Sequence, residues 1–215
     1  MSIMCAIWTS RNNITHDKGE FDPVRSMKHI QEALAILELP QDHARILPGH
    51  GWRPADDGWI KINVDGSIAM ESRRGGVGGV ARSPSAFKAA WCKPYYGITD
   101  PLLAEALALR DGVIFAKLRG YDQVILETDS QEVVNLWHSR HDFSMVAPIL
   151  DEIGEHASSF KFFLIQHVLR STNFPAHLCA KQASTMDVTD CWLDSIPSLL
   201  VTSLLADVAG VVSVE

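Results

Sequence analysis

Hydrophobic and polar residues recur with two different periods along this chain, and the change of period divides it into regions. Over 22–39, hydrophobic residues recur every three or four positions behind Asp22-Pro23, which predicts an amphipathic helix capped by the Asp. A stretch rich in Pro and Gly over 40–57 then predicts a linker. We expect three regions: an N-terminal helical extension and linker at 1–57, a domain at 58–186, and an apolar tail at 187–215 that docks as a short helix.

Within the central region, three strands come first, and helices and strands then alternate. Ile60, Ile62 and Val64 alternate with polar residues, which is the period of two of a half-buried strand. Similar signals predict strands at 59–67, 75–82, 86–96, 124–128 and 160–168, and helices at 101–118, 131–138, 145–157 and 174–184. This order predicts an α/β fold with a mixed five-stranded sheet and helices on both faces.

Composition and charge exclude several classes of protein. The 215 residues are 47% hydrophobic and 21% charged, so a folded core is expected. The net charge of -7 excludes a polycation that binds nucleic acid by charge alone, but not an enzyme whose metal ions supply positive charge. No run approaches the ~20 apolar residues of a membrane span, and the N-terminus lacks a secretion signal. With four scattered cysteines as well, we expect an intracellular protein without a membrane partner.

Three acidic residues lie where packing alone does not explain them. Asp65 and Asp129 each end a predicted strand, and Glu105 lies on a stripe of small apolar residues in the helix LLAEALAL. Two carboxylates about 4 Å apart repel by roughly 4 kcal/mol at an effective dielectric constant near 20. Such a cluster needs shared protons or a divalent cation, and oxygen ligands suit Mg²⁺ or Mn²⁺. Taken singly, an Asp at a strand end is most often a turn residue or a helix cap.

Five motifs, in this order, resemble the type 1 ribonuclease H domain: KINVDGS, GGVGGVAR, AEALAL, ETDS and HVLRSTNFPAHLCAKQA. The closer similarity is to the plant reverse-transcriptase-like branch, which derives from non-LTR retrotransposons. The resemblance covers about residues 58–184. It implies a ribonuclease H-like sheet of strand order 3-2-1-4-5, with Asp65 and Asp129 side by side under the helix that carries Glu105.

The resemblance implies a metal-dependent endonuclease that hydrolyses the RNA strand of RNA–DNA hybrids with two Mg²⁺ or Mn²⁺ ions. Asp65 would bridge both ions, and Glu105 and Asp129 would complete the first site. His177 occupies the position of a fourth acidic ligand. An imidazole is a poorer Mg²⁺ ligand than a carboxylate, so we expect weaker binding of the second ion or a preference for Mn²⁺. A lone His on a helix is otherwise more often a packing residue.

The resemblance also suggests residues that contact the nucleic acid. These are Ser67, Arg73, Arg74, Ser130 and Asn173. For the two arginines, a solvated turn is an equal alternative. His167 either assists proton transfer or product release, as in many relatives, or is a structural residue at the end of a strand.

Two rival hypotheses remain open at this level. One is a non-catalytic, domesticated module that binds nucleic acid or a protein, which His177, the acidic charge and the apolar tail favour. The other is a retrotransposon fragment without a present role. Neither the oligomeric state nor the compartment follows from the sequence.

Overall fold

The computed structural model describes residues 51–139 and 144–212, and side chains as far as Asp207. The predicted helix at 22–39 and most of the linker lie outside the described residues. One sheet organises the described part, with the strand order β5-β4-β1-β2-β3-β6. Its strands are β1 (Ile60–Ala69), β2 (Arg74–Arg82), β3 (Phe87–Tyr96), β4 (Gln123–Thr128), β5 (Phe162–His167) and β6 (Asp190–Leu193). Pairing is parallel between β1, β4 and β5, and antiparallel among the others.

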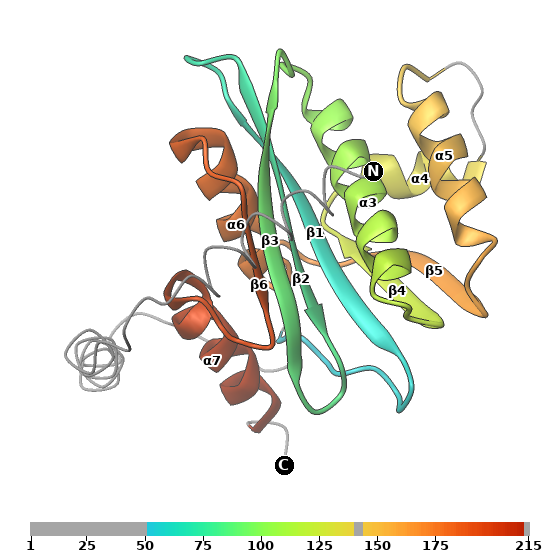
Figure 1. The fold of residues 1–215 in the computed structure, drawn as a ribbon, viewed down its shortest axis with the longest axis vertical. Coiled ribbons are helices and arrows are strands. Elements are labelled where there is room, and N and C mark those ends of the chain that lie inside the picture. The colour runs from blue at the N-terminus through green and yellow to red at the C-terminus, as the bar shows by residue number, and fades with distance from the viewer. Residues whose placement is uncertain (1–50, 140–143, 213–215) are drawn as a thin grey trace, which may run out of the picture.

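Helices cover both faces of this sheet, so the predicted ribonuclease H-like α/β class is confirmed (Figure 1). One face carries α3 (Pro101–Leu118), α4 (Gln131–Ser139) and α5 (Ala147–Ala157), and the other carries α6 (Phe174–Met186) and α7 (Ser198–Val212). The implied order 3-2-1-4-5 holds for the first five strands.

The prediction of a five-stranded sheet followed by a helical tail was incomplete. Residues Asp190–Leu193 form a sixth strand, which pairs with β3, and the helix α7 follows it. The reason is the packing of the tail on two sides: Cys191 and Leu193 pack against the core under α3, whereas Trp192 packs against the cluster under α6 and α7. This alternation is the period of two of a strand.

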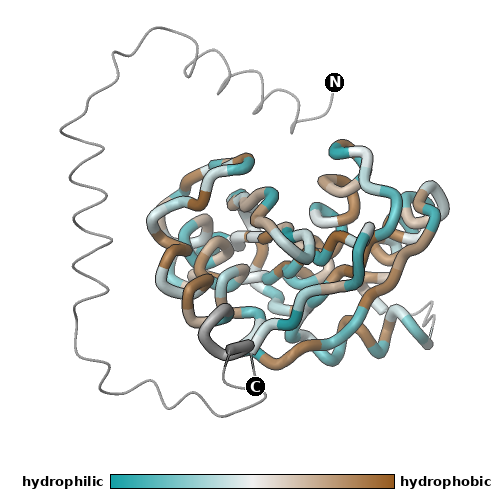
Figure 2. The backbone as a smooth tube through the Cα atoms, turned by 90° about the horizontal axis from the view of Figure 1, so that it is seen from below, coloured by the Kyte–Doolittle hydropathy of each residue, from teal (hydrophilic) through white to brown (hydrophobic). Residues whose placement is uncertain are grey.

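The main core lies between the sheet and α3. Hydrophobic and hydrophilic segments alternate along the described backbone (Figure 2). Ile62, Val64 and Leu126 are fully buried there, and they face Ala108 and Leu109 of α3. The Asp100 side chain caps α3 by accepting a hydrogen bond of 2.8 Å from the Leu102 amide. The small apolar stripe predicted for this helix therefore does lie against the sheet.

Close contact between helix and sheet on the second face depends on glycine in β2. A Cβ atom added at Gly78 would lie 2.3 Å from the backbone nitrogen of Ala180 in α6. Any larger side chain would thus push α6 off the sheet. The predicted strand is rich in glycine because α6 packs directly on it. This contact brings the start of α6 next to β1.

Candidate metal centre

Asp65 and Asp129 are neighbours because the pairing of β1 and β4 stops just before them. The last parallel pair is Asn63 with Glu127, and each aspartate lies two residues beyond it. The prediction that Asp65 ends its strand was wrong, since β1 continues to Ala69 in its pairing with β2. The two aspartates lie where β1 and β4 separate, so their carboxylates face the same space.

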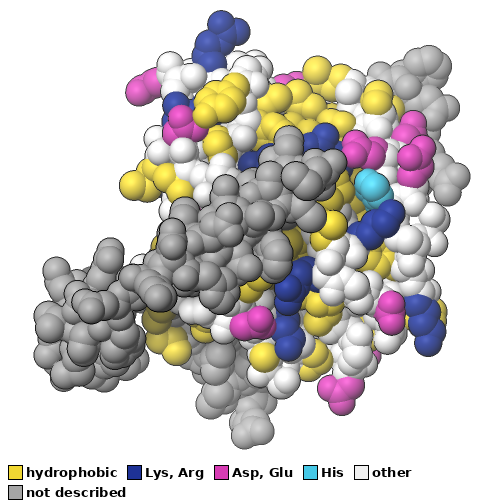
Figure 3. All heavy atoms as spheres, in the orientation of Figure 1, with side chains coloured by type: hydrophobic (Ala, Val, Ile, Leu, Met, Phe, Trp, Pro, Cys, Tyr) yellow, Lys and Arg dark blue, Asp and Glu magenta, His cyan; other side chains and the backbone are white. Residues whose placement is uncertain are grey.

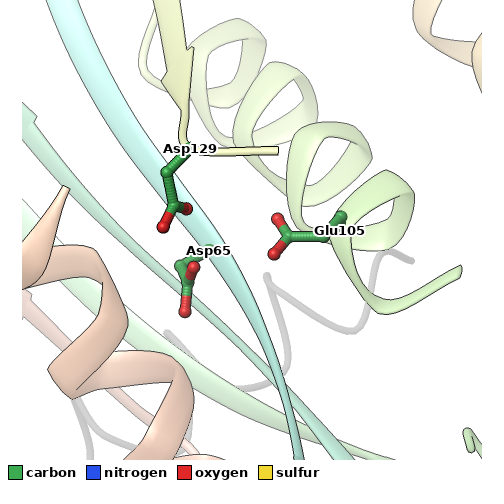
Figure 4. Close-up of side chains that lie close together, drawn as sticks. All are labelled: Asp65, Glu105 and Asp129. Atoms are coloured by element: carbon green, nitrogen blue, oxygen red, sulfur yellow. The ribbon is translucent and has the colours of Figure 1, made fainter. Parts of the chain in front are cut away.

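Glu105 joins them from α3 because this helix lies unusually close to β1. A Cβ atom at Gly66 would lie 2.5 Å from the backbone of Ala104, so only glycine permits the contact. The Gly66 amide hydrogen-bonds to the Glu105 carboxylate, and Thr128 Oγ1 donates to Glu105 Oε2 at 3.4 Å. Figure 4 shows the three carboxylates pointing toward one another from β1, α3 and the end of β4. Their ligand oxygens lie within 4.8 Å of one another.

The electrostatics of this cluster are those of an uncompensated group of acids. Burial, with the nearby Asp129 charge, raises the pKa of Asp65 to about 6, although the bond from His177 opposes this rise. Burial, followed by the charges of Asp65 and Asp129, raises the pKa of Glu105 well above its usual value. A divalent cation would remove the repulsion, and carboxylate oxygens are the ligands that Mg²⁺ and Mn²⁺ prefer. The residues present therefore fit such an ion.

His177 reaches the cluster from the first turn of α6. Its Nδ1 lies 3.0 Å from Asp65 Oδ2. The structure therefore brings together all four residues that the resemblance assigned to the centre. The neutral imidazole with a proton on Nδ1 would donate to Asp65, which leaves Nε2 as its acceptor nitrogen.

The sequence reasoning missed Arg170, which lies in the loop between β5 and α6. Its Nη1 is 3.8 Å from Asp129 Oδ2, and its Nη2 is 3.4 Å from His177 Nε2. The side chain is 69% exposed, so its charge is well solvated while it adjoins the acids. A basic residue in the loop that leads to His177 was the available signal.

Two residues proposed as contacts for nucleic acid have protein partners here. Asn173 is fully buried, and its Nδ2 donates to Asp129 Oδ1 and to the Val64 carbonyl, both at 2.9 Å. Ser130 caps α4, since its Oγ accepts from the Val133 amide at 3.4 Å. Asn173 thus holds the Asp129 carboxylate, and Ser130 fixes the start of the helix that follows Asp129.

The remaining candidates lie farther along the elements. Ser67 is two residues beyond Asp65 in β1 and accepts a hydrogen bond from Ser184 of α6. Arg74 pairs with Ala69, roughly 13 Å along the strand from Asp65, and its guanidinium is 3.6 Å from Asp187. Arg73 is exposed in the turn before it, with a φ of 49°. His167 is exposed and pairs with Thr128, beside Asp129.

Outside the carboxylate cluster, the visible surface is electrostatically mixed. On the face in Figure 3, where grey atoms do not cover it, Lys and Arg alternate with Asp and Glu and do not form one basic stripe. This agrees with the acidic balance of the whole chain. In the part of the chain that the structure describes, no helix is both long and apolar enough to cross a membrane.

Comparison with known proteins identifies the family. The model of the reverse transcriptase-like family matches residues 63–183, which is more than half of the chain. The protein belongs to this family. The matched range contains all four residues of the candidate centre. No curated protein matches the chain in sequence.

Solved ribonuclease H structures share the fold. The ribonuclease H1 of the archaeon Halobacterium salinarum is 24% identical, with a TM-score of 0.55, over 60% of this chain and 99% of that chain. The N-terminal ribonuclease H domain of a Mycobacterium tuberculosis protein is 22% identical, with a TM-score of 0.55, over 60% of this chain and 94% of that one. LC11-RNase H1, solved in complex with an RNA/DNA hybrid, is 18% identical with a TM-score of 0.53, over 60% and 98%.

Proposed function

We propose that this protein is a metal-dependent endonuclease that hydrolyses the RNA strand of RNA–DNA hybrids. The observation that carries the proposal is the convergence of Asp65, Glu105 and Asp129 within 4.8 Å, in a reverse transcriptase-like chain with a ribonuclease H fold. The structure of LC11-RNase H1 with a hybrid supports this class of substrate. The proposal includes membership of the plant, retrotransposon-derived branch. It also includes a division of the chain into three regions, at 1–57, 58–186 and 187–215.

The residues of this chain would hold two Mg²⁺ or Mn²⁺ ions and align the substrate. Bound ions would activate water and stabilise the leaving 3′ oxygen, so that hydrolysis yields a 3′-hydroxyl and a 5′-phosphate. Asp65 would be the central ligand, with Glu105 and Asp129 beside it. His177 would orient Asp65 through its Nδ1, and its Nε2, which lies near Arg170, would be the nitrogen available to a second ion. Arg170, exposed beside Asp129, supplies a cation for a phosphate.

The proposal is tested with purified protein and a hybrid that carries labelled RNA, in Mg²⁺, in Mn²⁺ or with a chelator. Single-stranded RNA, double-stranded RNA and double-stranded DNA serve as comparison substrates. The variants are Asp129→Asn and, as a matched control, Asp151→Asn on the exposed surface of α5. We expect cleavage of the hybrid that requires metal, survives in Asp151→Asn and is lost in Asp129→Asn.

Two outcomes would contradict the nuclease. Binding of the hybrid without cleavage in either metal would support the non-catalytic module. The natural His177, which stands where the resemblance implies an acidic residue, also favours that module. Cleavage that persists in Asp129→Asn would show a contaminating nuclease or a different site.

A further inference from the structure

A row of buried polar side chains runs beneath α6, on the sheet face away from α3. Asn63 is fully buried, and Glu127 and Arg82 are at most 5% exposed. Such groups are costly to bury unless each is paired. Their pairing is continuous, and it connects the carboxylate cluster with the C-terminal helix α7.

The chain of bonds starts at Asp129. Asn173 donates from Nδ2 to Asp129 Oδ1 and to the Val64 carbonyl, so both of its N–H groups are used. Its Oδ1 accepts a bond of 3.2 Å from Asn63 Nδ2. Only one orientation of the Asn173 amide satisfies all three contacts, because a flipped amide would place oxygen against two acceptors.

Asn63 is fixed in the same way by its other partners. Its second N–H group donates to Glu127 Oε2 at 2.9 Å, and its Oδ1 accepts from Arg82 Nη2 at 2.8 Å. Glu127 is held in turn by Lys61 at 2.7 Å and by Gln166 at 3.0 Å. The orientation of Asn63, and through it that of Asn173, is therefore set jointly by Glu127 and by the Arg82 guanidinium.

Besides its bond to Asn63, Arg82 is held by segments outside the six-stranded sheet. Its Nη1 bonds to Asp207 of α7, and its guanidinium stacks 3.8 Å from the centre of the Trp52 ring. The Trp52 backbone also hydrogen-bonds to the Asp207 carboxylate. Asp207 is 8% exposed and is 125 residues from Arg82 in sequence. Without this carboxylate, the buried guanidinium would lose its directly bonded anion and keep only the charge of Glu127.

We propose that Asp207 of α7 is a positioning residue for the metal centre, acting through Arg82, Asn63 and Asn173 on the Asp129 carboxylate. The C-terminal helix is then a part of the nuclease centre and not only a cover for the sheet. The consequence for metal binding rests on the proposed function. The effect on Asn173 does not, because the hydrogen bonds exist without metal.

The first measurement is made on the full chain without metal. The side-chain amide protons of Asn173, assigned by comparison with Asn173→Ala, are observed by NMR in wild type and in Asp207→Asn. We expect the Asn173 resonances to shift and their hydrogen exchange to accelerate. As a matched control, Leu204→Ala removes apolar packing from the same helix and leaves the bonded chain intact, so its Asn173 resonances should not change.

The second measurement is Mn²⁺ affinity by titration. Asn173→Ala should weaken binding by about 10- to 100-fold, as loss of a partner of a metal ligand does. Asp207→Asn acts from farther away, and we expect a loss of about three- to tenfold. In the Asn173→Ala background, Asp207→Asn should have no additional effect, since the connection is already broken.

If Asp207→Asn does not fold, the double replacement Arg82→Met with Asp207→Leu removes both buried charges and breaks the same connection. Unchanged Asn173 resonances in the folded variant would overturn the inference, whether or not the protein cleaves RNA. Equal changes in Leu204→Ala would overturn it as well, because general loosening of α7 would then explain them. If Asn173 responds and wild type binds no Mn²⁺, the proposed function fails and the structural connection stands.

Discussion

The strand β1 presents opposite chemistry to the two faces of the sheet, because its alternate residues point to α3 and to α6. Toward α3 it presents Ile62 and Val64, which pack in an apolar core with Leu126. Toward α6 it presents Asn63 and Asp65, which are equally buried but hydrogen-bonded. The two sides of β1 are equally buried, and they differ only in the chemistry of the buried side chains.

The difference assigns separate roles to the faces. Apolar burial stabilises a fold by about 25 cal/mol for each Å² removed from water, without a need for particular angles. A buried polar network contributes little net stability and fixes orientation instead. The α3 side of β1 therefore stabilises the domain, and its α6 side orients the carboxylates, beside the smaller apolar cluster under α6 and α7. Glu105 crosses this division, since it reaches the centre from α3.

The largest expected effect comes from removing a charge at the polar end of β1. In Asp65→Asn, cleavage of the hybrid should fall by more than about 100-fold, because loss of a ligand exceeds the usual effect of losing its partner. The melting temperature without metal should stay equal or rise, since repulsion from Asp129 and Glu105 is relieved. Kinetics and thermal unfolding of the same sample measure both. If the variant is inactive because it is unfolded, the claim that Asp65 serves metal binding and not stability is contradicted.

The apolar face should respond in the opposite sense. Leu126→Ala leaves a cavity beside Ile62 and should lower the free energy of unfolding by about 2–5 kcal/mol. Metal affinity of the folded fraction should be unchanged. Urea unfolding combined with a Mn²⁺ titration at low temperature checks this, and a large loss of affinity with little loss of stability would be evidence against separate roles.

A rise in pH should lower the stability of the metal-free protein and raise its affinity for metal. Folding raises the pKa of Asp65 from 3.8 to about 6, so the folded protein binds more protons between these values. The stabilisation is complete below the unfolded pKa and is lost as pH rises through about 6, by at most about 3 kcal/mol. Metal affinity rises over the same range, because the ligand must be deprotonated.

Unfolding of the metal-free protein at about pH 5 and about pH 7 tests this dependence, with Asp65→Asn as the reference. Wild type should lose more stability than the variant between the two values. Parallel changes in the two proteins would show that Asp65 does not carry the raised pKa.

The smallest effect is expected at His177. In His177→Asp, the carboxylate would restore the acidic pattern of the family, and Mg²⁺ affinity should increase by about tenfold or less. Mg²⁺ dependence of cleavage measures it, and Mn²⁺ dependence should change less. Weaker Mg²⁺ binding in the variant would show that the bond from His177 to Asp65 matters more than the added charge.

The sequence predicted one face of the sheet better than the other. The alternation of Ile62 and Val64 and the stripe of small apolar residues in α3 are local patterns. Each predicts the type of the element and the side that it buries. As a polar residue of a half-buried strand, Asn63 was expected to face solvent. It is buried instead and bonds to Arg82, whose own partner Asp207 is distant in sequence, so no local pattern shows this burial. The strand β6 was missed because its four residues lie within an apolar run.

The resemblance implied both the residues of the candidate centre and their coarse arrangement, but not the hydrogen bonds around them. Order along the chain and a family resemblance brought Asp65, Glu105, Asp129 and His177 together, and the structure does place them side by side. The exposed Arg170 and the buried role of Asn173 depend on the path of one loop. No periodicity encodes that path.

The most direct test of the account is a Mn²⁺ titration by calorimetry of wild type, Asp65→Asn and Leu126→Ala, each shown to be folded. We expect binding in wild type and in Leu126→Ala, with similar affinities, and no binding in Asp65→Asn. Equal binding in all three proteins, or binding lost only in Leu126→Ala, would contradict the claim that the carboxylates on the polar face hold the metal.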